Sequence, residues 1–204
     1  MMQAVPNLLT FEEFINWYPN TRIRYELRNG VIVEMPPPTG DHEKVVGFIA
    51  RKLTVEFDRL NLPYTIPKTA FVKPEFANSA YLPDVLLLNL DNLSNEPLWK
   101  KESTVSQALS IPLIVEVVSS NWRDDYYKKL ADYEEMGVPE YWIADYAALG
   151  GKKFIGDPKQ PTLFVFELVN GEYRINQFQG ESQIISPNFP QLNLTAQQVF
   201  DAAI

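Results

Sequence analysis

The stretch 111–145 constrains the fold of this chain most, because it has the pattern of a strand, a helix and a second strand. Ile111–Val118 is a short apolar, β-branched run, which is typical of a strand buried on both faces. Apolar residues at helical spacing follow over Asp124–Met136, and Gly137 predicts the end of that helix. Glu140–Asp145 resumes a strand pattern. Two strands joined by so long a connection are most simply parallel neighbours in one sheet, with a right-handed crossover.

Glu116 is the anomaly of this stretch, because it is a carboxylate in the middle of Ile-Val-Glu-Val-Val. Burial of an unpaired charge costs a large free energy, so a cation, a metal ion or a proton should lie against it.

Composition limits the class of protein. A chain of 204 residues with 46% hydrophobic residues is expected to fold as one packed domain. The absence of cysteine excludes disulfides and thiolate metal sites and favours a cytoplasmic location. The N-terminal segment has neither the basic nor the apolar region of a signal peptide, and no apolar run reaches the ~20 residues of a membrane span. The net charge of -8 counts against a nucleic-acid partner, although a local patch can override it.

The first half of the chain contains several local signals. Thr10 and Glu13 form a capping box that predicts a short helix over 11–17, and Asn29-Gly30 predicts the turn of a β-hairpin. A long amphipathic helix is expected over 42–60, and short strands are expected between 63 and 72. The apolar face expected for that helix comprises Val46, Ile49, Leu53, Phe57 and Leu60.

Further signals follow to the C-terminus. Val85–Leu88 is expected to be a buried strand, and 90–110 is expected to be a long polar loop, functional or mobile. A second hairpin is predicted at 163–178, turned by Asn170-Gly171, and a capping box at Thr195 begins a final helix. We expect a single domain over 1–204, with the hairpin 163–178 as an appendage too small to stand alone.

Two carboxylates are candidates for a metal site. Asp84 stands at the head of one buried strand and Glu116 lies within another, so neighbouring strands could bring them together. Oxygen ligands of this kind suit Mg²⁺ or Mn²⁺. Asp84 could equally be a turn residue after proline, and Glu116 could belong to a buried ion pair with Lys129. Helical spacing also allows surface pairs of Asp125 with Lys129 and of Asp124 with Lys128.

The motifs PDVLLL and VEVVS, followed by D-x-x-x-K-L-x-x-Y-x-x-x-G-V-P-E-Y-W-I-x-D, resemble the Uma-two family of candidate endonucleases, in the PD-(D/E)XK superfamily. The resemblance, which includes YELRNG and the helix start at His42, covers about 9–145. It implies a restriction-endonuclease-like α/β fold, a mixed β-sheet flanked by helices. It also implies a Mg²⁺ (or Mn²⁺) site built from Asp84 and Glu116, with the carbonyl of Val117 as a further ligand.

The chain departs from the superfamily pattern at Val118, where that pattern has a lysine two residues after the glutamate. The family resemblance assigns the lysine to Lys129 on the next helix, which would orient the attacking water and stabilise charge on the phosphate. Glu26 and His42 also match family positions, although Glu26 could be a cross-strand hairpin charge and His42 a solvated helix start.

Two functions are compatible with these residues. The first is metal-dependent hydrolysis of phosphodiester bonds in nucleic acid, DNA in the first instance, by an endonuclease that could act as a homodimer. The second is a non-catalytic interaction module that retains the fold, because a fold does not determine a function. Lysine pairs at 100–101 and 152–153 gathered around the site would favour the nuclease, and their dispersal would favour the module.

Overall fold

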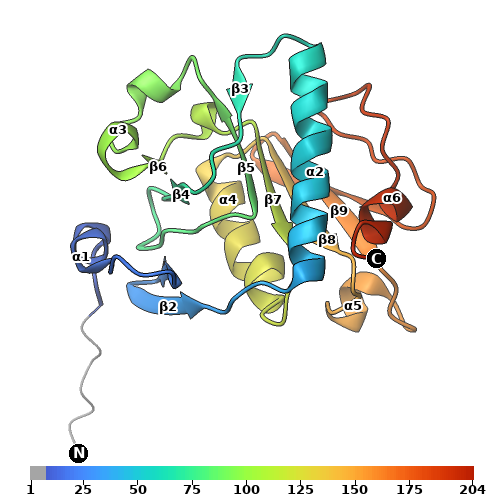
Figure 1. Ribbon diagram of the computed structural model, residues 1–204, viewed down its shortest axis with the longest axis horizontal. Helices are drawn as coiled ribbons and strands as arrows, with labels where there is room; N and C mark the ends of the chain where they lie inside the picture. The colour runs from blue at the N-terminus through green and yellow to red at the C-terminus, as the bar shows by residue number, and fades with distance from the viewer. Residues whose placement is uncertain (1–7) are drawn as a thin grey trace, which may run out of the picture.

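The computed structural model describes residues 8–204, so the start of the segment searched for a signal peptide, residues 1–7, lies outside the described residues. The fold is a mixed six-stranded sheet with helices on both faces, plus two small two-stranded sheets (Figure 1). The helices are α1 (Phe11–Trp17), α2 (Gly40–Arg59), η1 (Leu93–Asn95), α3 (Trp99–Glu102), η2 (Ala108–Ser110), η3 (Asp124–Lys129), α4 (Leu130–Met136), α5 (Lys152–Ile155) and α6 (Ala196–Asp201). The strands are β1 (Arg24–Arg28), β2 (Val31–Met35), β3 (Tyr64–Thr65), β4 (Phe71–Val72), β5 (Val85–Asn89), β6 (Thr104–Val105), β7 (Leu113–Val117), β8 (Glu140–Asp145), β9 (Thr162–Val169) and β10 (Glu172–Phe178).

The main sheet has the order β10-β9-β8-β7-β5-β3. Strands β7 and β8 are parallel, as the strand–helix–strand pattern predicts, and the other pairs are antiparallel. Both central strands are buried along their whole length, in agreement with their apolar runs. The predicted mixed α/β fold is therefore confirmed.

The two faces of the sheet pack against different helices. On one face α2 and α6 cover an apolar core that includes Val115 and Val117 of β7. On the other face η3 and α4 cover a second core that includes Ile114 and Val118, and Glu116 lies between these two residues in the alternation of the strand. A third, smaller cluster joins α1 to the β1–β2 hairpin.

Local signals account for several element boundaries. Thr10 and Thr195 each make the predicted capping box. Asn29 and Gly30 both have positive φ at the predicted hairpin turn, and Gly137 ends α4 in the left-handed conformation.

Several expectations need correction. Hairpin β9–β10 is no appendage, because β9 pairs with β8 over six residues, 140–145, and lies inside the sheet. Segment 90–110 is no plain loop, since it holds four short elements and the Glu96 carboxylate accepts hydrogen bonds from the backbone N–H groups of Ser106 and Gln107.

Helices also differ in detail from expectation. The buried face of α2 includes Val45 rather than Val46, and Leu60 is its exposed C-cap. The helix expected over 124–136 begins with a π-helical turn, η3, before it continues as α4. Wide turns of this kind occur frequently at functional sites.

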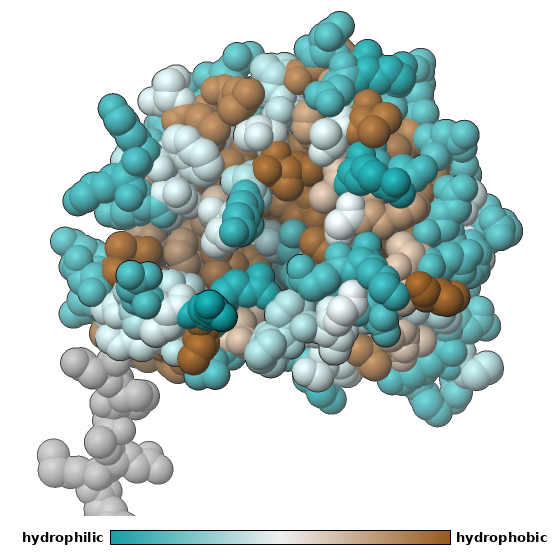
Figure 2. Space-filling view, in the orientation of Figure 1, coloured by the Kyte–Doolittle hydropathy of each residue, from teal (hydrophilic) through white to brown (hydrophobic). Residues whose placement is uncertain are grey.

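The surface of the face drawn in Figure 2 is hydrophilic over most of its rim, and apolar residues show between polar ones towards the middle. No helix within residues 8–204 is long and apolar enough to cross a membrane.

Candidate active site

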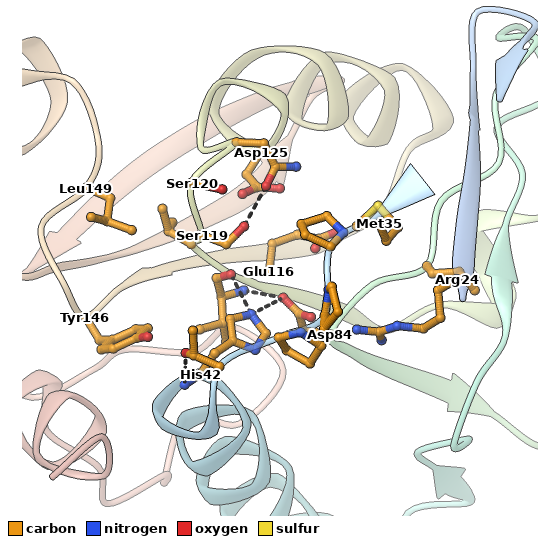
Figure 3. A pocket seen from close by; sticks show the side chains of 18 of the residues that line it. Arg24, Met35, His42, Asp84, Glu116, Ser119, Ser120, Asp125, Tyr146 and Leu149 are labelled. Carbon is orange, nitrogen blue, oxygen red and sulfur yellow. Dashed lines mark hydrogen bonds and ion pairs between the residues drawn. The ribbon is translucent and has the colours of Figure 1, made fainter. Parts of the chain in front are cut away.

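A pocket of about 300 Å³ opens where several elements of the fold meet (Figure 3). Its lining combines the end of β7 and the loop after it, the residue before β5, the start of α2, the open end of the β1–β2 hairpin and the π-helical turn. The lining includes six titratable side chains discussed below, Arg24, His42, Asp84, Glu116, Asp125 and Lys129.

Asp84 and Glu116 are brought together by strand pairing. Val85 of β5 pairs with Val115 of β7, so Asp84, one step before Val85, stands opposite Glu116. Both carboxylates line the pocket. Asp84 Oδ2 accepts a hydrogen bond of 2.8 Å from the backbone N–H of Val117, which fixes its orientation.

His42 reaches the same point from the first turn of α2. Its Nε2 lies 3.1 Å from the carbonyl oxygen of Val117 and 3.4 Å from Asp84 Oδ2. Because both partners accept, Nε2 carries the proton and donates. Burial lowers the pKa of His42, but the hydrogen bond and charge of Asp84 outweigh burial and raise it overall. His42 is only 6% exposed and is therefore not the solvated helix-start residue considered as an alternative.

Lys129 is the centre of a buried charge cluster. Its Nζ lies 3.0 Å from Glu116 Oε1, 3.3 Å from Asp125 Oδ1 and 3.5 Å from Glu26 Oε1. The side chain is 2% exposed, so these carboxylates surround its ammonium group in place of water. Tyr133 adds a hydrogen bond of 3.2 Å from its hydroxyl to Glu116 Oε1.

Glu26 connects this cluster to the β1–β2 hairpin. It is fully buried, accepts a hydrogen bond of 3.0 Å from the backbone N–H of Leu82 and pairs with Arg28 at 2.7 Å. Arg28 in turn pairs with Asp124. Glu26 contacts Lys129 but is absent from the lining of the pocket, so its contact with the site runs through Lys129.

Carboxylates outnumber cations in this cluster, and the pKa values of Glu116, Asp125 and Lys129 are shifted. Burial raises the pKa of Glu116 well above its ordinary value, and the charges of Asp125, Asp84 and Glu26 raise it further against the opposing effect of Lys129. Burial likewise raises the pKa of Asp125 to about 6. Burial lowers the pKa of Lys129, but its carboxylate neighbours outweigh burial and keep the ammonium charged.

Lys128 has a different environment from its neighbour. Its Nζ lies 2.6 Å and 2.7 Å from the two carboxylate oxygens of Asp132, which also accepts a hydrogen bond from the Tyr81 hydroxyl. The surface pair of Asp124 with Lys128 does not form, because Asp124 pairs with Arg28 instead. The pair of Asp125 with Lys129 forms, but it is buried rather than on the surface.

The residues present fit a hard divalent cation. Asp84, Glu116 and the Val117 carbonyl are all oxygen donors, and both carboxylates face the pocket. Lys129 and Tyr133 both bind Oε1 of Glu116, and no donor within residues 8–204 reaches its Oε2. The set contains only two carboxylates, and nowhere in residues 8–204 do three or more His, Asp or Glu side chains form a group suited to a metal ion. The remaining ligands would be water and substrate.

Sequence reasoning missed Asp125 and Arg24. Asp125 was assigned only to a surface pair, although its i,i+4 spacing from an inward-facing Lys129 placed it beside the same site. Arg24 lines the pocket, and strand alternation could have found it, since Arg24, Glu26 and Arg28 share one face of β1.

Comparison with known proteins identifies the family. The model of the Uma-two (Uma2) family, described as "Putative restriction endonuclease", matches residues 11–197. The chain belongs to this family. The resemblance stated from the motifs is thereby confirmed, and the match extends through the C-terminal hairpin.

Two solved structures are similar to this one. A crystal structure of a putative nuclease belonging to DUF820 from Anabaena variabilis is 16% identical, covers 96% of this chain and 99% of its own, and superposes with a TM-score of 0.73, which shows a common fold. The apo form of NucC from E. coli MS115-1 is 14% identical over 67% of this chain and 79% of its own, with a TM-score of 0.32. No curated protein matches the chain.

Proposed function

We propose that the chain is a metal-dependent nuclease that hydrolyses phosphodiester bonds of nucleic acid, DNA in the first instance. The observation that carries the proposal is Lys129, a fully buried lysine held 3.0 Å from Glu116 beside a pocket that Asp84 also lines. A carboxylate pair and a lysine around one cavity suit phosphoryl chemistry, in which positioning and charge stabilisation dominate.

Asp84, Glu116 and the Val117 carbonyl would hold Mg²⁺ or Mn²⁺, which supplies an activated water and an electrophile for the phosphate oxygen. Lys129 lines the same pocket, so its ammonium can donate to the attacking water and stabilise negative charge on the phosphate. His42 positions the Val117 carbonyl and Asp84, and Glu26 positions Lys129. We extend the proposal to a cytoplasmic enzyme that could act as a homodimer.

A non-catalytic interaction module is the second candidate, and charge favours it. The net charge is -8, and the lysine pairs 100–101 and 152–153 are both absent from the pocket lining. They lie on α3 and α5, which are on opposite sides of the fold (Figure 1).

Calorimetric titration with Mg²⁺ and Mn²⁺, followed by cleavage assays on single- and double-stranded DNA and RNA, tests the proposal. We expect one metal site per chain and metal-dependent cleavage of at least one substrate, abolished by a chelator. Metal binding without cleavage of any of the four substrates would favour the module. Absence of metal binding would contradict the nuclease assignment.

A further inference from the structure

We propose that Arg24 is an anion-binding residue that holds a phosphate group of the substrate in the pocket. This inference deepens the proposed nuclease function and rests on it for the identity of the substrate. It assigns a role to a residue that the metal site and the buried cluster leave unused.

Arg24 occupies the open end of the β1–β2 hairpin, where it pairs in register with Met35. Both residues line the pocket, and the Arg24 side chain extends towards Asp84 (Figure 3). Because alternate residues of a strand share a face, Arg24 lies on the same side of β1 as Glu26, which contacts Lys129.

Arg24 forms no ion pair within residues 8–204, unlike the other cations nearby. Arg28, on the same strand, pairs with Glu26 and Asp124, and Lys129 is surrounded by carboxylates. Within residues 8–204 no carboxylate oxygen lies within ion-pair distance of the Arg24 guanidinium, although Asp84 lines the same pocket. The lining contains one arginine, Arg24, and one lysine, Lys129. Because carboxylates surround Lys129, Arg24 is the cation that is available to a ligand.

A phosphodiester is the anion that suits this position. A substrate that approaches Asp84, Glu116 and Asp125 meets an excess of negative charge, which a nearby guanidinium offsets. The planar guanidinium binds two phosphate oxygens at once, in a geometry that a lysine cannot reproduce. With a net charge of -8, the chain offers no broad attractive field, so a single local contact matters more.

The hairpin holds Arg24 in a fixed place. The backbone N–H of Tyr25 donates to the Tyr18 hydroxyl at 3.1 Å, and Leu27 exchanges two backbone hydrogen bonds with Ala80, of 3.0 Å and 2.8 Å. This backbone is therefore ordered on folding, so ligand binding does not have to offset the loss of its conformational entropy.

The test is fluorescence anisotropy of the full chain with a labelled single-stranded oligodeoxynucleotide and with a duplex of the same sequence, over a series of salt concentrations. Ca²⁺ replaces Mg²⁺ so that binding is measured apart from cleavage. The variants are Arg24→Ala, Arg24→Lys and the matched control Arg22→Ala, an exposed arginine two residues away that is absent from the pocket lining. Neither Arg24 nor Arg22 has an ion-pair partner within residues 8–204, so circular dichroism should show all three variants folded.

Arg24→Ala should weaken binding about 10- to 100-fold, the effect of one lost charge-assisted contact. It should also reduce the slope of log affinity against log salt by about 0.7–0.9, the value for one phosphate contact. Arg24→Lys should keep the slope and lose part of the affinity, and Arg22→Ala should change neither.

Equal affinities for Arg24→Ala and Arg22→Ala would overturn the inference, as would a wild type that binds neither oligonucleotide. If Arg24→Ala loses affinity while the wild type cleaves nothing with Mg²⁺ or Mn²⁺, the anion site stands and the nuclease assignment fails. If Arg24→Ala instead cleaves and binds as the wild type does, the anion site fails and the nuclease assignment stands.

Discussion

The two faces of the central sheet bury similar strands in different ways. Under α2 and α6 the core around β7 is apolar, and Val115 and Val117 pack with side chains such as Leu53. The buried carboxylate on this face, Glu140 of β8, accepts hydrogen bonds from Trp142 and Asn188. Under η3 and α4, β7 presents Glu116 to Lys129 and Asp125, among buried tyrosines. The tyrosine hydroxyls on this second face donate to carboxylates or carbonyls, as Tyr133 does to Glu116 and Tyr141 to the carbonyl of Asp125.

The difference shows how one sheet can combine stability with a charged site. Apolar burial under α2 contributes about 25 cal/mol for each Å² removed from water and needs no partner. The charged face must satisfy every buried polar group, and an ion pair there contributes little net stability. Stability alone therefore does not account for the charged residues of the second face.

Glu116→Gln should have the largest effect, because it should abolish metal binding while leaving stability almost unchanged. Loss of the carboxylate removes a proposed metal ligand, so metal binding and cleavage should both be abolished. The stability of the metal-free protein should change little, because Lys129 retains Glu26 and Asp125. The matched control is Glu140→Gln, a fully buried glutamate of β8 that is absent from the pocket lining. Calorimetric titration with Mg²⁺ measures the metal affinity of both variants. Wild-type affinity in Glu116→Gln would contradict the proposed metal site.

Substitution of the adjacent residues Lys128 and Lys129 should have the next largest effect on the charged face. Lys129→Ala should lose metal-dependent cleavage and lower the free energy of unfolding by about 3–5 kcal/mol, because it leaves buried carboxylates unpaired. Lys128→Ala should keep most of the cleavage, since Lys128 pairs with Asp132 away from the pocket. Urea denaturation and cleavage assays measure both effects.

Val118→Lys in the Lys129→Ala background sharpens this test. Val118 lies on the same strand face as Glu116 and lines the pocket, so a lysine there should restore part of the cleavage. Equal cleavage by Lys129→Ala and the wild type on all four kinds of nucleic acid would contradict the assignment.

The apolar face should respond in stability alone. Leu53→Ala should lower the free energy of unfolding by about 2–5 kcal/mol, through lost burial and a cavity under α2. Metal affinity at temperatures where the variant is folded should equal that of the wild type. A changed metal affinity would show that the two faces are not independent.

The smallest expected effect is a pH dependence that originates at Asp125. The folded-state pKa is raised from 3.8 to about 6, so between these values the folded chain keeps a proton that the unfolded chain has lost. The free energy of unfolding of the metal-free protein should therefore fall as the pH rises through this window, by at most about 3 kcal/mol. Asp125→Asn should flatten that decrease, and Asp58→Asn, at an exposed position on α2, should not. Denaturant titrations at several pH values measure it, and identical slopes for the wild type and Asp125→Asn would refute this origin.

Local patterns predicted much of the fold. The alternation and turn residues around Asn29-Gly30 and Asn170-Gly171 placed both hairpins, and the apolar run at 113–117 placed the central strand, since these signals act between close neighbours. The position of β9 inside the sheet was missed because strand order depends on contacts between distant segments. The π-helical turn was missed for a similar reason, since 124–136 has ordinary helical spacing and the wide turn appears only in the folded chain.

The candidate site was predictable in part. Glu116 was conspicuous because a charge interrupted an apolar strand, and Asp84 because it preceded another. The carboxylates that surround Lys129 were not recognisable as a group, since Glu26 is on a hairpin and Asp125 had an adequate local explanation as a surface pair.

The pairing of Arg28 with Asp124 has a consequence for the order of folding. The two residues are 96 positions apart, and Glu26 reaches Lys129 over a similar length of chain. Closing so long a loop costs conformational entropy that the ion pairs repay only after the segments between them are in place. We therefore expect the hairpin to dock after the transition state for folding. Substitutions at Arg28 should then mainly accelerate unfolding and leave the folding rate almost unchanged.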